Sequence, residues 1–212
     1  MRFLSAEEIF DDASRGIFKN LKEIIGFPGA VSAGESFSHG TTDLAILFNQ
    51  GVVMATDGRA TETNMHIGHE SFDKMCSLDS HSLVAISGVA GLGLAMAKLI
   101  KARFTFEAMV NEGIPLPAET KANIIAKSLG ENISLVLLYK MVVHPIMATF
   151  DLTERVPRGK IFDFWIDGVA KPCGRHVSCG SGSPVAETVL DLALDILKKE
   201  PEQLMPEEAK HL

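Results

Sequence analysis

The sequence predicts an α+β protein whose helices cover antiparallel sheets. Strand patterns come first along the chain, two helical patterns follow, and further strands and a final helix come after them. This grouping of like elements is typical of layered α+β folds, whereas strict alternation would indicate parallel βαβ units. A length of 212 residues with 46% apolar residues is enough for one domain with a substantial core.

The early strands are expected to form two hairpins. Thr41–Phe48 alternates apolar and polar residues, and a short turn leads into a second strand at Val52–Thr56. After a polar loop, Lys74–Leu78 and Ser82–Ser87 read as the second hairpin. The later strands are predicted at His144–Leu152, Lys160–Ile166 and His176–Cys179.

Three helices are predicted from apolar residues at helical spacing. Gly113 ends the first helix, and Pro184 suits the first position of the third. The positions expected to be buried are Leu92, Met96, Ile100, Phe104 and Ala108 in the first helix, Ala122, Ile125, Leu129 and Ile133 in the second, and Val185, Val189, Leu192 and Ile196 in the third.

Residues 1–40 form a separate segment in the sequence. Ser5 and Glu8 make a capping box, apolar residues continue at helical spacing to Ile24, and residues 30–40 read as an exposed linker. The segment is interpreted either as a mobile arm or as a propeptide that shields Thr41, with 41–212 as the catalytic domain.

Composition excludes several classes of partner. The 20 Lys and Arg against 27 Asp and Glu give a net charge of −7, and no basic block stands out, so nucleic acid and anionic membranes are poor candidates. Cys76, Cys173 and Cys179 lack metal-ligand or CxxC spacing and are expected to be reduced thiols. We expect a cytoplasmic protein with no signal peptide, membrane span, metal or cofactor.

The stretch Gly40-Thr41-Thr42 is the centre of the functional prediction. If the bond between Gly40 and Thr41 is cut, Thr41 carries both a hydroxyl nucleophile and a free α-amine. Such an amine titrates at about 8 and can act as the base near neutral pH. Uncut, the same nitrogen is an amide without basicity, so the site is silent until processing.

Four further residues could converge on this threonine. Asp57 ends a strand, Lys74 begins one, and Gly88 and Ser181 lie where strands meet helices. Each also has an ordinary interpretation: a turn residue, a solvated charge, a tight turn, and a small-residue loop. The Gly180–Gly182 loop lacks the GK[ST] that a phosphate loop requires.

Taken together, the motifs resemble the β subunits of the 20S proteasome, most closely the bacterial type. The carrying stretches are HGTT at 39–42, GVVMATDGRAT at 51–61, DKM at 73–75, AISGVAG at 85–91, KAN at 121–123 and GSGSP at 180–184. They occur in family order at near-family spacing. The resemblance implies a four-layer αββα sandwich of the N-terminal nucleophile hydrolase type.

The resemblance also implies roles. Thr41 would be the nucleophile, released by cleavage after Gly40, while Asp57 and Lys74 would hold its hydroxyl in the reactive state. Gly88 would supply an oxyanion N–H, and Ser181 would hydrogen-bond near the freed amine. The substrate pocket would have Ile86 at its base, Ala60 and Ala90 beside it, and Thr61 among its contacts, which favours cleavage after large apolar residues.

The implied protein is a self-processing threonine endopeptidase that degrades unfolded polypeptides inside a barrel. Its partners would be other β subunits in a heptameric ring, α-subunit rings and an ATPase that feeds substrate. The family continues with another helix, a loop and final strands, so the C-terminal part is expected to be incomplete and activity in doubt. The alternatives are an HslV-like two-ring peptidase and an inactive or truncated structural ring subunit.

Overall fold

A computed structural model describes residues 41–212 apart from 50, 59, 62–66, 70–72 and 140. The predicted helix and linker of residues 1–40, with Gly40, lie outside this part. The strands are β1 (Thr42–Phe48), β2 (Gly51–Thr56), β3 (Ala60–Thr61), β4 (Ile67–His69), β5 (Met75–Asp79), β6 (Ser82–Gly88), β7 (Val143–Asp151), β8 (Arg158–Phe164), β9 (Ala170–Cys173) and β10 (His176–Gly180). The helices are α2 (Ala90–Val110), α3 (Ala118–Glu131), α4 (Ile133–Tyr139), α5 (Ser183–Leu197) and α6 (Pro206–His211), with a 3₁₀ turn, η1, at Pro201–Gln203.

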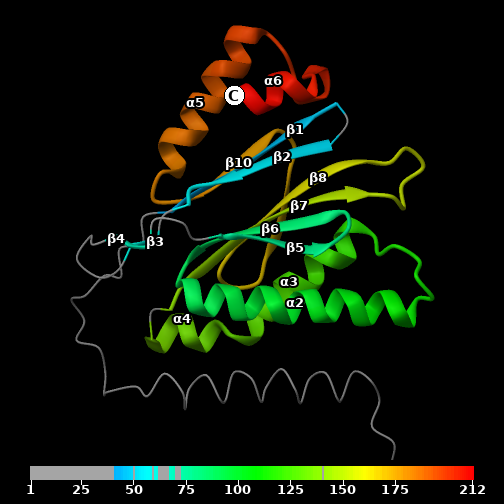
Figure 1. The fold of residues 1–212 in the computed structure, drawn as a ribbon, viewed down its shortest axis with the longest axis vertical. Coiled ribbons are helices and arrows are strands. Elements are labelled where there is room, and N and C mark those ends of the chain that lie inside the picture. Colours follow the sequence, from blue (N-terminus) through cyan, green and yellow to red (C-terminus); the bar gives the residue numbers. More distant parts are fainter. Residues whose placement is uncertain (1–40, 50, 59, 62–66, 70–72, 140) are drawn as a thin grey trace, which may run out of the picture. The chain divides into compact units, whose positions relative to one another are not determined.

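Two antiparallel sheets pack face to face and carry helices on their outer faces (Figure 1). One sheet has the order β10-β1-β2, and the other has the order β5-β6-β7-β8-β9. Helices α5 and α6 contact the first sheet, whereas α2 and α3 contact the second. The predicted α+β class and αββα layering are therefore confirmed.

Strand β1 is buried on both sides because it lies between the second sheet and the outer helices. Ala45 points into the cluster between the sheets, and its neighbour Ile46 points into the cluster under α5. Successive side chains of a strand alternate between faces. Thr41 and Asp43 therefore share the inter-sheet face with Ala45, and both are buried.

The predicted helix faces are confirmed for α2 and α3, where Leu92 and Ile125 are typical buried members, except that Ala108 is only partly buried and Ile133 lies partly buried in α4. The prediction for α5 is wrong. The four side chains of its predicted stripe are exposed, namely Val185, Val189, Leu192 and Ile196. Leu190 and Leu194 are buried instead. Leu204 and Ala209 pack beside those two leucines, so contacts with the following segment select which of two apolar faces turns inward.

The remaining differences concern element boundaries. The second predicted helix is divided into α3 and α4, and the edge strand β9 was not anticipated. Residues 201–212, which follow α5, contain η1 and α6. Among the described residues, no helix is long and apolar enough to cross a membrane.

Candidate active site

Thr41 and Lys74 come from different sheets and meet between them. Thr41 immediately precedes β1 and is 5% exposed, and Lys74 immediately precedes β5 and is also 5% exposed. The backbone carbonyl of Lys74 accepts a hydrogen bond from Ile86 N at 3.2 Å, which fixes the lysine to β6. Its Nζ donates to Thr41 Oγ1 at 2.8 Å. The alternative that Lys74 is a solvated surface charge is wrong.

Asp57 completes this contact from the end of β2. Lys74 Nζ lies 2.7 Å from Asp57 Oδ1. The same oxygen accepts a hydrogen bond from Thr42 N at 3.2 Å, and Asp57 N donates to Thr42 O at 3.0 Å. Because its carboxylate and its backbone are both anchored to β1, Asp57 can hold the lysine ammonium against the threonine hydroxyl.

Gly88 ends β6 in a backbone conformation that requires glycine. Its φ is +103°, and an added Cβ would lie 2.2 Å from the carbonyl oxygen of Val142. The next residue, Val89, donates its N–H to that oxygen at 3.0 Å. The turn is therefore held rigidly at the point where β6 runs into α2. Its role as an oxyanion donor stays a prediction.

The loop Gly180–Gly182 lies tightly against the start of β1. Ser181 Oγ donates to the backbone carbonyl of Thr41 at 3.4 Å. A Cβ on Gly180 would lie 2.1 Å from that same carbonyl oxygen, and one on Gly182 would lie 2.1 Å from Thr42 Oγ1. The small residues of this motif are explained by close approach to Thr41 and Thr42.

Asp43 is a member of this region that the sequence analysis missed. It is fully buried, and burial raises the pKa of its carboxyl to about 6. Cys179 Sγ donates a weak hydrogen bond to its Oδ2 at 3.5 Å, and no donor from the described part of the chain reaches Oδ1. The available signal was a charged residue two positions after Thr41, on the same side of the predicted strand.

The predicted substrate-pocket residues are placed as follows. Ile86 is 7% exposed, and a Cβ on Gly93 of α2 would clash with its Cγ2 at 2.5 Å, so Ile86 packs closely on that helix. Ala90 begins α2, one residue after Val89. Ala60 and Thr61 form β3, which pairs with β4. Their function as a pocket stays a prediction.

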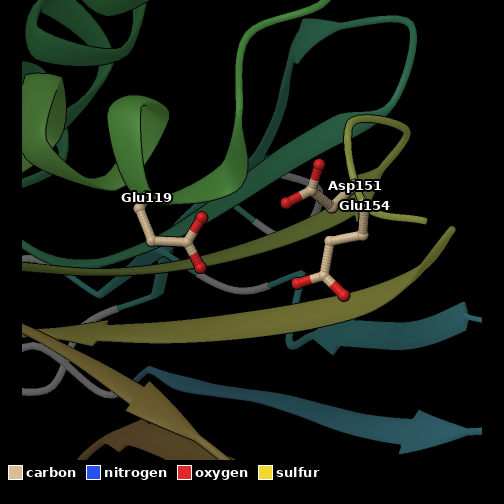
Figure 2. Close-up of side chains that lie close together, drawn as sticks. All are labelled: Glu119, Asp151 and Glu154. Atoms are coloured by element: carbon tan, nitrogen blue, oxygen red, sulfur yellow. The ribbon is translucent and has the colours of Figure 1, made fainter. Parts of the chain in front are cut away.

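One cluster of carboxylates has the geometry of a possible metal site. Figure 2 shows Glu119, Asp151 and Glu154 facing one another, with carboxylate oxygens within 4.8 Å. Lys160 Nζ lies between them, at 2.7 Å from Glu119, 2.9 Å from Asp151 and 2.6 Å from Glu154. The ammonium ion already supplies the positive charge, so this is a salt-bridge cluster.

An αββα sandwich with a threonine hydroxyl at the start of a central strand has the architecture of the N-terminal nucleophile hydrolases. Residues 37–211 match the family model of proteasome subunits. The chain belongs to the proteasome subunit family.

Individual relatives agree with this assignment. The chain is 36% identical over 160 residues to proteasome subunit beta of Stackebrandtia nassauensis, a match that covers 74% of this chain and 56% of the relative. It is 33% identical over 163 residues to proteasome subunit beta 1 of Streptomyces avermitilis, a match that covers 76% of this chain and 56% of that relative. It is 31% identical over 183 residues to proteasome subunit beta of Streptomyces griseus, a match that covers 86% of this chain and 62% of that relative. The matches thus span little more than half the length of these relatives.

Proposed function

We propose that this chain is a threonine endopeptidase subunit of a bacterial-type proteasome. The observation that carries the proposal is the 2.8 Å hydrogen bond from the buried ammonium of Lys74 to the hydroxyl of Thr41. A buried lysine held against a threonine hydroxyl is costly unless paired, and Asp57 at 2.7 Å supplies the compensating charge. An inactive structural subunit would not need this arrangement.

The reaction proceeds in two steps once cleavage between Gly40 and Thr41 has freed the α-amine. Thr41 Oγ attacks the carbonyl carbon of the substrate peptide while its proton passes to the amine. The C–N bond then breaks, the leaving amine takes that proton, and an acyl ester remains on Thr41. The α-amine of Thr41 then takes a proton from a water molecule, and that water hydrolyses the ester. This step releases the substrate acid and restores the hydroxyl of Thr41.

The neighbouring residues have supporting roles in this scheme. The positive charge of Lys74 stabilises the oxygen of Thr41 as it loses its proton, and Asp57 keeps the ammonium aimed at that oxygen. The N–H of Gly88 donates to the oxyanion that develops on the substrate carbonyl. Ser181 donates a hydrogen bond to the backbone carbonyl of Thr41 and so positions the backbone that carries the α-amine of Thr41.

Substrate preference follows from an uncharged pocket. Ile86 is apolar and lies two residues before Gly88, and Ala60, Thr61 and Ala90 add small side chains without charge. We propose that peptides are cut faster after Leu, Phe or Tyr than after Arg. A panel of fluorogenic peptides measures this directly, and faster cleavage after Arg would contradict the pocket.

The proposed setting is a cytoplasmic barrel of stacked rings, with α-subunit rings, other β subunits and an ATPase unfoldase as partners. Residues 1–40 act as the propeptide. The exposed apolar stripe of α5, from Val185 to Ile196, is a surface that ring assembly could cover. An HslV-type two-ring peptidase would share the chemistry of Thr41 but would not need the α-subunit rings.

The test is to compare Thr41→Ala with Thr41→Ser in the full chain. Thr41→Ala lacks the hydroxyl, so we expect no peptide hydrolysis and retention of the 1–40 segment. Thr41→Ser keeps a hydroxyl and should still process itself and turn over peptides. N-terminal sequencing and peptidase assays are the measurements. Self-processing of Thr41→Ala would show that Thr41 is not the nucleophile.

A further inference from the structure

Asp43 is a buried acid beside the proposed reaction centre to which the scheme above gives no role. Asp43 lies in β1 two residues after Thr41, so both side chains point to the same side of the sheet, and that of Asp43 is fully buried. Burying a carboxylate is costly unless hydrogen bonds or an opposite charge compensate it. Few hydrogen bonds do so here. Cys179 donates only a weak thiol hydrogen bond, and Oδ1 has no donor within the described residues.

The groups that face Asp43 come from every element packed around it. Lys74, before β5, attracts the carboxylate, and Asp57, after β2, repels it. From β7, His144 also acts on it electrostatically, and Nε2 of this histidine lies 2.7 Å from Asp163 Oδ1 on β8. From β10 comes the Cys179 thiol, which also accepts a hydrogen bond from Ser87 Oγ of β6 at 3.4 Å.

We propose that Asp43 is a positioning residue that acts through Lys74 as a second counter-charge and thereby sets the pH at which Thr41 becomes reactive. This inference rests on the proposed peptidase function. Because burial raises the pKa of Asp43 to about 6, its charge changes close to neutral pH. The ionised and neutral forms therefore give the site two different charge states within the physiological range.

The sign of the effect follows from counting charges. With Asp43 ionised, Lys74, Asp57 and Asp43 sum to −1, and with Asp43 neutral they sum to zero. A negative surrounding favours the protonated form of the Thr41 amine, which cannot act as base. Neutralising Asp43 should therefore lower the pKa of that amine and make the enzyme active at lower pH.

The first experiment measures the coupling without using activity. The carboxyl carbon of Asp43 is followed by NMR from pH 4 to 9 in ¹³C-labelled full-length protein, with Asp43→Asn to assign the signal. In Lys74→Met the attracting charge is gone, so the titration midpoint of Asp43 should rise by on the order of one pH unit. Glu119→Gln removes an exposed charge of the Lys160 cluster, which is not among the charges that act on Asp43, and should leave the midpoint unchanged. An unchanged midpoint in Lys74→Met would overturn the proposal.

The second experiment measures kcat/KM against pH. In Asp43→Asn the rising limb of the plot of kcat/KM against pH should move to lower pH by on the order of one unit. In Glu119→Gln this plot should match that of the wild type. Asp43→Thr, which is uncharged and suited to a strand, provides a second neutral variant if the amide folds poorly. A rising limb that stays in place in a folded neutral variant contradicts the role of Asp43.

The two experiments separate the failure of this inference from failure of the proposed function. A wild-type protein that processes no leader and cleaves no peptide at any pH contradicts the proposed function and the effect of Asp43 on rate. A working peptidase without coupling between Lys74 and Asp43 contradicts only the assignment made to Asp43.

Discussion

Two lysines of this protein, the buried Lys74 and the partly buried Lys160, have different surroundings, and the difference distinguishes a proposed chemical role from a structural one. Lys160 lies within salt-bridge distance of three carboxylates, those of Glu119, Asp151 and Glu154. Lys74 donates to Asp57 and also to the hydroxyl of Thr41. A lysine surrounded by carboxylates stabilises the fold, whereas a lysine directed at a hydroxyl can change the reactivity of that hydroxyl.

The acids beside the two lysines differ in the same way. For Asp151, burial acts to raise the pKa, but hydrogen bonds from Thr153 and Lys160 outweigh it and hold the pKa well below its usual range. For Asp43 no comparable donors compensate, and burial raises the pKa to about 6. Each carboxylate is almost completely buried. The hydrogen bonds that Asp151 receives and Asp43 lacks therefore help to explain why the pKa values of these two acids shift in opposite directions.

The largest expected effect is on activity, at Lys74. Lys74→Ala should lower kcat/KM by roughly 10²–10⁴-fold, the range for losing one positioned acid–base or electrostatic group. Lys74→Arg should fail as well, since the guanidinium fork differs in shape and proton affinity. Peptidase assays and thermal unfolding are the measurements, with Lys127→Ala on the exposed face of α3 as the matched control. Near-normal turnover in Lys74→Arg would remove the chemical distinction between the two lysines.

The next effect is on stability, at Lys160. Lys160→Met leaves Asp151 buried without its ammonium partner, and breaking a buried pair costs about 3–5 kcal/mol in the free energy of unfolding. Activity per folded molecule should not change. Urea unfolding measures the loss, and Lys171→Met on the exposed edge strand β9 is the control. A loss no larger than that of the control would show that the cluster in Figure 2 contributes little.

The smallest effect is the pH dependence of unfolding, which should have opposite signs at the two acids. Asp151 has a depressed pKa in the folded state, so its stabilisation is present above the unfolded pKa of about 4 and is lost as pH falls. Asp43 has a raised folded pKa, so the folded state binds its proton more tightly. Its contribution to the free energy of unfolding therefore decreases as pH rises from about 4 to about 6.

The measurement is urea unfolding of wild type, Asp43→Asn and Asp151→Asn between pH 3 and 8. The difference between wild type and Asp43→Asn should change by up to about 3 kcal/mol across this interval, since one pKa unit corresponds to about 1.4 kcal/mol. The difference for Asp151→Asn should grow with pH at the acid end. Parallel curves for wild type and Asp43→Asn would show that Asp43 does not titrate as inferred.

Local patterns of the sequence were sufficient to predict much of the fold and the residues of the proposed reaction centre. Alternation placed β1 and β2, and helical spacing identified the buried faces of α2 and α3. The resemblance of several short motifs to the proteasome β subunits singled out Thr41, Asp57 and Lys74, which the structure brings into one hydrogen-bonded group. Strand alternation fixes which face a side chain occupies, and short motifs fix turns, so both can be read without knowledge of distant contacts.

Tertiary structure alone decided what depends on contacts between remote segments. Helix α5 has two apolar faces, and Leu190 and Leu194 are buried because β1 and the segment around Leu204 lie against that side. Asp43 became a candidate only when the packing of the two sheets enclosed it, which raises the pKa of a group that its position in the sequence leaves unremarkable. Periodicity shows that a face is apolar or polar, but burial and charge environment depend on which distant residues pack against it.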